Sequence, residues 1–442
     1  MKHEPIVSAP PVRAFWLPWV VLALGAPALF LLPITHDAIW QIWLGRQMLG
    51  GAELYLDIIE VNPPLWFWIA EPLAALGADP RLTVIGFFIA TMAVSLFLTP
   101  PRFRLPAAAV ILLVPLHDFG QREHFTLLAT IPYVFAVATR ARRETPRFPV
   151  LVGLLAALGI CLKPHFLLVP LALELLVHRG GHVRAETVTL ALGGLAYAAA
   201  IPIFAPAYFM VALPIVMRFY GAFGQAHPNY IMLAAAFVLA AAGAWGGRRK
   251  GSIETRALVL ASLAFVPAVL IQDKGFAYHS LPARGLLALA AIVELVRLRD
   301  SPWADGLLVG TVVLCCWPFG FYVNPWRAEA EFHFAGIPRG SSVIVLASNP
   351  SAAWPMVEEH GFRWGLHQFS TWQVNAVIRN PALLPDARRI VAPDLAKRPD
   401  LLIVDHRPVL GSTAAALMPP GYLRCYGLWR QSTRLRSYRR VC

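Results

Sequence analysis

The first polar stretch of the chain places acidic side chains where they could handle a proton. His36 and Asp37 follow directly after the apolar run Phe15–Ile34, and Asp57 and Glu60 come later in the same stretch. A carboxylate within hydrogen-bond reach of a hydroxyl can take its proton. An acidic residue beside a membrane-spanning run is costly and functional by default, although a solvated helix end would also explain Asp37. We predict that these four polar residues belong to an active site.

A second polar cluster, His117–His124, lies between two apolar segments. Its candidate site residues are Asp118, Gln121, Arg122, Glu123 and His124. Two histidines and two carboxylates would also suit a metal ion, but no Asp-x-Asp motif accompanies them and Arg122 would repel a cation. We therefore predict no resident metal or other cofactor and leave a divalent cation, Mg²⁺ or Mn²⁺, as an open alternative.

Two further polar corners supply positive charge. They are Lys163-Pro164-His165, at a break between two apolar segments, and Gln272–His279. A single Lys or His at a membrane boundary could simply extend to lipid headgroups. Several of them on one face, together with Arg122, favour an anionic phosphate ligand. The expected phosphate-binding residues are Arg122, Lys163, His165, Lys274, Tyr278 and His279.

The composition excludes a soluble enzyme. Of the 442 residues, 57% are hydrophobic and 14% are charged, whereas an average soluble domain carries about 25% charge. A soluble fold of this size could not bury so much apolar surface, and disordered or collagen-like chains are excluded as well. The net charge of +13 fits Arg-rich cytoplasmic loops. No basic run is interleaved with aromatic residues as in a nucleic-acid binder.

The hydropathy pattern predicts an α-helical polytopic membrane protein. We expect about 11 spans, near residues 15–34, 82–99, 105–117, 125–139, 149–163, 166–178, 187–204, 230–246, 257–272, 281–298 and 305–322. The first lacks a small-x-small cleavage site, so an uncleaved helix is expected rather than a signal peptide. Residues 63–81 contain four prolines and are expected to form a juxtamembrane or re-entrant helix. The alternative is that 63–79 spans and a later short segment does not.

Basic residues decide the expected orientation. Arg and Lys gather in five loops, at 102–104, 140–147, 179–184, 248–256 and 297–299. With the N-terminus inside, all five loops are cytoplasmic, as the positive-inside rule requires. The polar clusters described above are then external. The expected location is a bacterial inner membrane, with the site on the periplasmic side.

The tail of the chain differs from the rest. Residues 341–347 and 400–405 have the composition of β-strands. Outside the cytoplasm, Cys425 and Cys442 would be free to pair as a disulfide. The expected domains are a membrane domain, 1–322, and a small periplasmic α/β domain, 323–442.

The first polar stretch resembles the first external loop of GT-C glycosyltransferases, the group that includes dolichyl-phosphate mannosyltransferase-like and aminoarabinose transferase-like enzymes. The matching pattern is Asp37-x-x-Trp40, Gly50-Gly51, Tyr55-x-Asp57 and Pro63-Pro64-Leu65. The likeness covers about residues 15–100 in motif and the whole chain in architecture. It implies Asp37 as the general base of a displacement that inverts the sugar. The family has a second acidic residue in a later external loop. The candidates for this position here are Asp118 and Glu123, in a stretch whose sequence differs from the family's common one.

The expected function is transfer of a sugar from a polyprenyl-phosphate donor to a lipid or polysaccharide acceptor. The expected partners are that donor, the acceptor and membrane lipids, and no nucleic acid. A flippase or transporter of lipid-linked glycans is the first alternative, but its charges should lie in mid-span. A polymerase or ligase that uses the same donors is the second. A non-enzymatic sensor with an external α/β domain is the third.

Overall fold

The computed structural model describes residues 12–177, 183–222, 224, 228–246, 251–297, 301–316 and 325–442. The predicted loop residues Arg179, Arg248, Arg249, Lys250 and Arg299 lie outside this part of the chain. The chain divides into two compact units. Unit 1 comprises Met1–Pro33, Ile85–Tyr197 and Ala226–Phe321, and unit 2 comprises Ile34–Val84, Ala198–Gln225 and Tyr322–Cys442.

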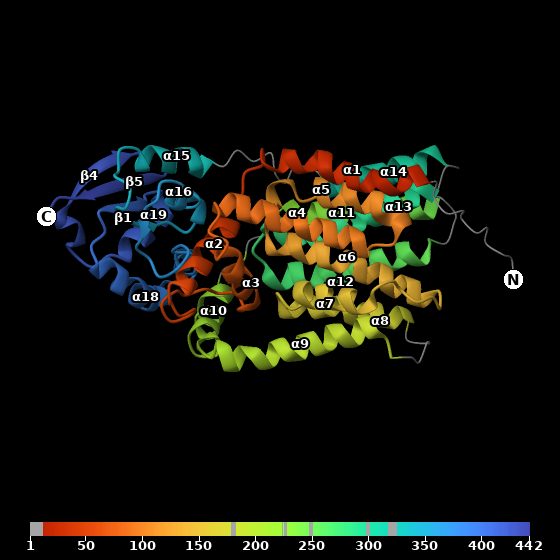
Figure 1. The fold of residues 1–442 in the computed structure, drawn as a ribbon. Coiled ribbons are helices and arrows are strands. Elements are labelled where there is room, and N and C mark those ends of the chain that lie inside the picture. The colour runs from red at the N-terminus through yellow and green to blue at the C-terminus, as the bar shows by residue number, and fades with distance from the viewer. Residues whose placement is uncertain are drawn as a thin grey trace. The chain divides into compact units, whose positions relative to one another are not determined.

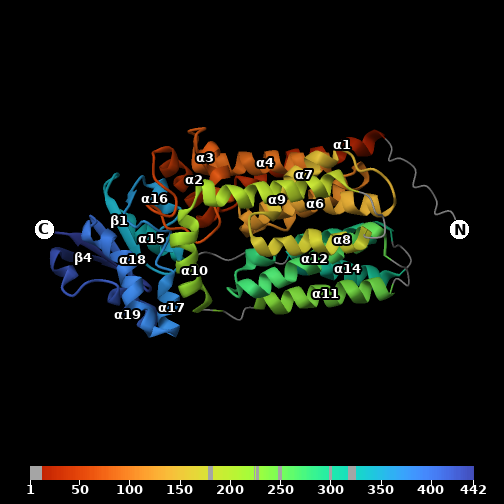
Figure 2. The same ribbon diagram turned by 90° about the horizontal axis from the view of Figure 1, so that it is seen from below.

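Unit 1 is a bundle of helices that lie side by side in Figures 1 and 2. Among its packed pairs are α6 with α7, α12 with α13 and α11 with α14. α4 and α9 contribute residues to both units. The helices are α1 (Val12–Leu29), α4 (Pro80–Leu98), α5 (Arg104–Leu113), α6 (Arg122–Ala141), α7 (Pro149–Ile160), α8 (Leu168–Val177), α9 (Ala185–Phe204), α11 (Pro228–Gly246), α12 (Ile253–Gln272), α13 (Leu281–Arg297) and α14 (Pro302–Cys316).

Four helices in the described part of the chain are long and apolar enough to cross a membrane. They are Pro80–Leu98, Ala185–Phe204, Ile253–Gln272 and Ala277–Arg297. Each of the other predicted segments also contains a helix, but these helices are shorter or more polar. Leu171, Leu175 and Leu192 are 61–76% exposed on α8 and α9, a surface that suits lipid rather than water. The four candidate spans and this apolar surface fit a multi-pass membrane protein.

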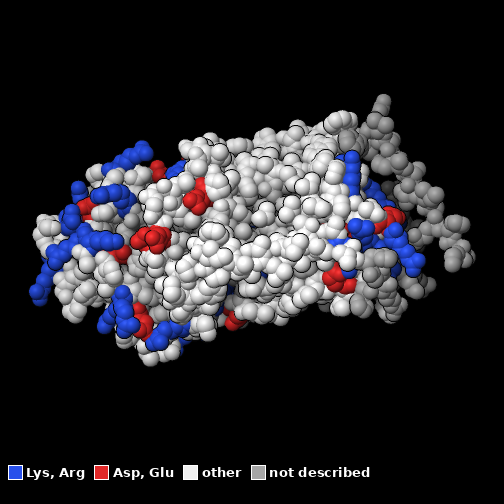
Figure 3. All heavy atoms as spheres, turned by 60° about the horizontal axis from the view of Figure 1, so that its bottom comes forward, with Lys and Arg blue, Asp and Glu red and all other residues white. Residues whose placement is uncertain are grey.

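Charged side chains of unit 1 gather at the helix ends. On the face shown in Figure 3, basic and acidic atoms cluster near one end of the bundle, and its middle is white. Arg140 in the last turn of α6 pairs with Glu186 in the first turn of α9, and Arg142 and Arg102 both pair with Glu254 in the first turn of α12. These Arg residues come from the loops that the sequence predicts to be cytoplasmic.

Unit 2 combines short helices with a five-stranded sheet. The sheet has the order β2-β1-β3-β5-β4, with β1 parallel to β2 and β3, and β5 antiparallel to β3 and β4. The strands are β1 (Ser342–Leu346), β2 (Arg363–Trp364), β3 (Leu401–Asp405), β4 (Tyr426–Gln431) and β5 (Leu435–Arg440). The helices that lie wholly in this unit are α2 (His36–Leu49), α3 (Leu65–Ala74), α10 (Leu213–Phe219), α15 (Pro325–Phe334), α16 (Met356–Glu359), α17 (Gln373–Arg379), α18 (Leu384–Ala396) and α19 (Pro408–Ala416).

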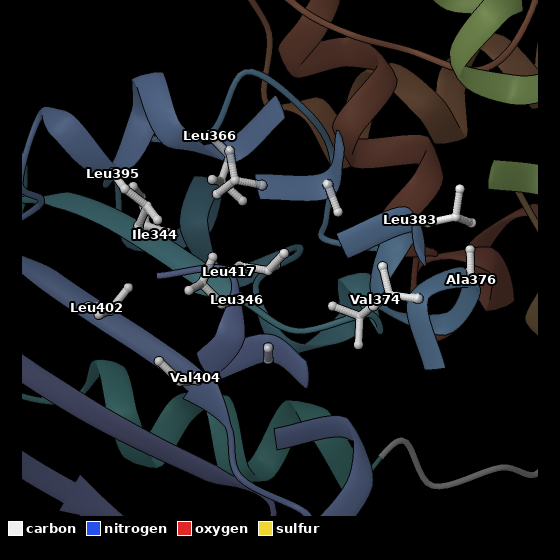
Figure 4. Packing of buried hydrophobic residues seen from close by; sticks show 14 of the residues in the cluster. Ile344, Leu346, Leu366, Val374, Ala376, Leu383, Leu395, Leu402, Val404 and Leu417 are labelled. Atoms are coloured by element: carbon white, nitrogen blue, oxygen red, sulfur yellow. The ribbon is translucent and has the colours of Figure 1, made fainter. Parts of the chain in front are cut away.

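The core of unit 2 forms where β1 and β3 meet the surrounding helices. Ile344 and Leu346 from β1 and Leu402 and Val404 from β3 are buried in one cluster with residues of α17, α18 and α19, as Figure 4 shows. These two strands confirm the predictions at 341–347 and 400–405. Cys425 and Cys442 form a disulfide that ties the C-terminus to the start of β4.

Candidate functional site

Lys163 is the centre of a buried polar group in unit 1. It precedes the turn Pro164–Leu167, after the end of α7, and its side chain is 8% exposed. Its Nζ donates to Glu123 Oε1 at 2.5 Å and also to Gln272 Oε1. Glu123 lies in the first turn of α6 and Gln272 ends α12, so three helices meet at this ammonium. A buried charge needs such partners.

More cations surround this pair. Arg122, Lys163, His165 and Lys274 are close enough for their charges to act on His279. Arg122, Lys163, Lys274 and His279 are each at most 6% exposed. The sequence predicts these five residues as phosphate-binding, and the structure brings all five together. Such a concentration of buried positive charge suits an anion that accepts hydrogen bonds from several donors.

Glu123 and His165 each place a buried polar atom in this group that has no hydrogen-bond partner among the described residues. These atoms are Glu123 Oε2 and His165 Nε2. The carboxylate oxygen can accept a hydrogen bond, and the imidazole nitrogen can donate or accept one. A bound molecule with hydroxyl and phosphate groups would satisfy both atoms. Buried polar atoms usually find partners, so the two atoms favour a polar ligand here.

Tyr278 borders the cation group. Its ring stacks on Phe276 with a 5.5 Å centroid distance and meets the edge of His279 at 4.6 Å. The backbone N–H of Gly275 donates to Tyr230 Oη at 3.3 Å, which holds this loop against α11. Tyr278 therefore orients His279.

Asp118 is engaged by a residue that the sequence analysis did not assign to it. Arg284 Nη2 donates to Asp118 Oδ2 at 2.8 Å, and the same guanidinium reaches the Cys315 carbonyl at 2.9 Å. Burial raises the pKa of Asp118 to about 6, although the Arg284 charge and its hydrogen bond act in the opposite direction. This ion pair fixes α13 to the loop before α6, so its first role is structural.

Gln121 and His124 flank the cation group on α6. Gln121 is the N-cap residue of the helix and is 2% exposed. The His124 ring stacks on Phe88 at 4.7 Å and tilts against Phe119 at 5.4 Å. These aromatic neighbours give His124 a packing role.

The predicted residues of the first loop lie in unit 2. Thr35 caps α2, and Asp37 in its first turn is favoured by the positive end of the helix. The Asp37 side chain is 15% exposed, and its Oδ2 lies 3.5 Å from His36 Nε2. His36 Nδ1 is 3.0 Å from the hydroxyl of Ser351. Asp37 is thus a reachable carboxylate held beside an imidazole.

The other two predicted carboxylates support local structure. Glu60 is buried and accepts hydrogen bonds from Trp40 Nε1 at 2.9 Å and Asn62 Nδ2 at 2.7 Å. Asp57 is exposed and accepts the backbone N–H of Glu53 at 2.8 Å. Both carboxylates shape the loop that follows α2.

The structure gives three polar pairings that the sequence analysis did not predict. They are Gln272 with Lys163, Arg284 with Asp118, and Ser351 with His36. Gln272 carries no charge and Ser351 lies far along the chain, so only the fold reveals them. In the part of the chain that the structure describes, no three His, Cys, Asp or Glu side chains are grouped as metal ligands.

The fold and these sites define the class: a mostly helical protein with four candidate membrane spans, a mixed five-stranded sheet and a buried cluster of cationic residues. No protein-family model and no curated protein sequence matches the chain. Its activity is therefore inferred from the chemistry of the site and from the resemblance of its first loop.

Proposed function

We propose that the chain is a GT-C-like membrane glycosyltransferase that moves a sugar from a polyprenyl-phosphate donor to a lipid or glycan acceptor. The observation that carries the proposal is the buried gathering of Arg122, Lys163, His165, Lys274 and His279 in unit 1. A polyprenyl-phosphate sugar combines a long apolar tail with an anionic phosphate at the membrane boundary. This group offers the phosphate several donors within a helical bundle.

The leaving group of the proposed reaction is a phosphate ester, which needs little protonation. Positive charge that is already in place stabilises the negative charge that develops as the sugar–phosphate bond breaks. Lys163 is preorganised for this role because Glu123 and Gln272 hold its ammonium. Arg122 and Lys274 add charge to the same group. A single displacement then inverts the anomeric centre.

The acceptor hydroxyl must lose a proton as it attacks the sugar. Asp37 is the proposed general base, as the resemblance of its loop implies. Its partial exposure leaves the carboxylate reachable by an acceptor, and His36 restrains it. Asp57 and Glu60 then act on the shape of the loop rather than on the sugar.

The proposed location is a bacterial inner membrane, crossed by about 11 spans, with the cation group facing the periplasm. α6 carries Arg122 at its start and Arg140 at its end. Loops rich in Arg are typical of the cytoplasmic side. The disulfide Cys425–Cys442 suits an oxidising compartment. The expected domain limits, 1–322 and 323–442, belong to the same proposal.

A flippase or transporter of lipid-linked glycans is the second candidate. The buried pair Lys163–Glu123 favours it, because intramembrane ion pairs also mark transport paths. A polymerase or ligase that uses the same donors would share the donor chemistry and differ in its acceptor. A flippase moves the donor without consuming it, and a polymerase or ligase joins the sugar to a different acceptor. An analysis of the products therefore separates both candidates from the transferase.

The test measures release of polyprenyl phosphate from a panel of lipid-linked sugars by the purified chain, with a total lipid and glycan extract as acceptor. Asp37→Asn should bind donor like the wild type and lose turnover. Lys163→Gln should lose donor binding. The control is Glu53→Gln, which removes an exposed carboxylate from the same loop.

Turnover by Asp37→Asn at the wild-type rate would remove Asp37 from the chemical step. Proteoliposomes that move donor across the bilayer without consuming it would replace the transferase by the flippase. Formation of long products from one donor would identify the polymerase. Donor binding that survives Lys163→Gln would contradict the phosphate role of the cation group.

A further inference from the structure

The β4–β5 hairpin at the C-terminus of unit 2 carries an arrangement that the proposed reaction does not use. Trp429 lies with its ring near two guanidinium groups. The Arg430 Cζ is 5.1 Å and the Arg439 Cζ is 5.4 Å from the ring centroid. Gly336, which follows α15, lies close beneath Trp429 and Arg430, where a Cβ would be 3.9 Å from each. We propose that Trp429, Arg430 and Arg439 form a binding face for an anionic polysaccharide.

The charge of the surrounding segment is one-sided. Residues 406–442 contain seven Arg and no Asp or Glu. Arg407, Arg434 and Arg440 pair with carboxylates from other segments, namely Asp405, Glu329 and Asp400. Among the described residues no carboxylate pairs with Arg430 or Arg439, so the charge of these two side chains is open to an external anion.

The contacts of the proposed face are with neutral groups. Arg430 donates to the backbone carbonyl of Phe332, and its guanidinium also lies over that ring. Arg439 is exposed and lies over Trp429. A neutral partner orients a guanidinium without neutralising it. Planar guanidinium groups match carboxylate and phosphate oxygens in a bidentate manner.

The indole favours a sugar between these charges. Trp429 is half-buried, and its Nε1 has no hydrogen-bond partner among the described residues. An aromatic ring with a polar edge offers a flat apolar surface and one donor. The C–H face of a pyranose packs on such a surface. The combination of indole and guanidinium therefore fits a sugar that carries a negative charge.

The position of the hairpin in unit 2 argues for a soluble polymer rather than for lipid. β4 is one edge of the sheet and β2 is the other. The first loop attaches beside β2, where Ile59 pairs with Gln368 and the Gln368 carbonyl accepts from Trp364 Nε1. α3, the apolar helix of this unit, follows that loop, and Figures 1 and 2 both show it well apart from β4. The basic face is thus remote from the part of the unit that suits a membrane.

Binding is tested with the full chain in nanodiscs of zwitterionic lipid. The probe is polygalacturonate, and neutral dextran is the comparison. The wild type should bind polygalacturonate with an affinity that falls as salt rises, because neutralised charges release counterions. Dextran should not bind. Arg430→Gln/Arg439→Gln should weaken binding by roughly tenfold or more and reduce the salt slope by about two.

Two further variants separate specific contacts from net charge. Trp429→Ala should weaken binding and leave the salt slope unchanged, because it removes packing and not charge. The control Arg389→Gln/Lys397→Gln removes two charges from side chains that are 80% and 69% exposed in the same unit. It should bind polygalacturonate like the wild type.

Three results would overturn the proposal. One is a control variant that loses as much affinity as the hairpin variant, because any basic surface of the unit would then bind the polymer. Another is tighter binding to anionic lipid vesicles or to single-stranded DNA than to polygalacturonate. The third is binding by the wild type that does not depend on salt. Sugar transfer itself is not needed for any of these measurements, so the two proposals fail independently.

Discussion

The hydroxyl of Ser351 lies 3.0 Å from Nδ1 of His36, across 315 residues of chain. The other nitrogen of this imidazole, Nε2, is 3.5 Å from Asp37 Oδ2. Phe369 adds a ring contact to His36 at 5.7 Å. The C-terminal part of the chain therefore holds the histidine that restrains the proposed general base. This gives that part a role as a positioning element.

Ser351→Ala should reduce turnover through the orientation of Asp37. Loss of the hydrogen bond frees the His36 ring, and small errors in the position of a reacting group are costly, so we expect kcat to fall roughly tenfold with KM little changed. The measurement is steady-state release of polyprenyl phosphate. Ser370→Ala is the control, because Ser370 is also buried but bonds to the Ser348 carbonyl. An equal change in both variants would mean general loosening and no positioning role.

Lys163→Met should destabilise unit 1 and abolish donor binding. It leaves the Glu123 carboxylate buried without its partner, which costs about 3–5 kcal/mol in comparable sites. The double variant Lys163→Met/Glu123→Leu should recover stability, because apolar side chains replace a buried pair well. It should not recover donor binding.

Thermal unfolding in detergent and donor binding are measured on the same preparations of these variants. Arg297→Gln is the control, because it removes a pair whose Arg side chain is 42% exposed and exposed pairs contribute little. Donor binding by the double variant would show that Lys163 is only structural.

The stability of unit 2 should depend on pH through His333. Burial lowers the pKa of His333 to about 4, although the Glu329 charge opposes this shift. Both ring nitrogens contact serines, at 2.8 Å to Ser437 and 3.0 Å to Ser432. The folded chain binds this proton less readily than the unfolded chain, whose His pKa is about 6.5. The contribution is therefore complete above about pH 6.5 and is lost as the pH falls towards 4, by at most about 3 kcal/mol.

Hydrogen exchange of β5 amides between pH 7 and 4 tests this dependence, after correction for intrinsic exchange rates. The wild type should lose protection in this interval. His333→Gln should be less protected at pH 7 and should show a flatter profile. His360→Gln is the control, because that side chain is 38% exposed. Parallel profiles for the wild type and His333→Gln would remove His333 as the cause.

The predictability of the fold differed between its parts for physical reasons. β1 and β3 are continuous apolar runs because both are buried between parallel or mixed neighbours. β4 and β5 escaped prediction because β4 is an edge strand and β5 is Arg-rich, so neither has a clear hydrophobic alternation. Each apolar segment predicted from the sequence contains a helix in the structure. Four of the described helices are long and apolar enough to be candidate spans.

The chemistry of the site could be predicted by residue type but not by pairing. The charged residues in the breaks between apolar segments lie close together in the fold, as the sequence predicted, since few other places tolerate them. The pairing of Lys163 with Glu123 depends on how α6 and α7 pack, and these residues are 40 apart in the chain. Asp57 and Glu60 lie in the same polar stretch as Asp37, and the sequence predicts all three for the active site. Only the fold shows that Trp40 and the backbone of Glu53 use their oxygens.

Gly159 should be essential for the close approach of α7 to α6. A Cβ at this position would lie 2.5 Å from the Cβ of Ala129 on α6, so the two helices would have to separate. Such overpacking typically costs about 1–3 kcal/mol, and it would act on the same helix pair that carries Glu123 and Lys163. Gly159→Ala should therefore lower the apparent Tm in detergent and weaken donor binding. Gly86→Ala is the matched control, because nothing lies within 4 Å of its added Cβ. If Gly159→Ala unfolds like this control, the helices have room to move apart, and the cation group does not depend on their contact.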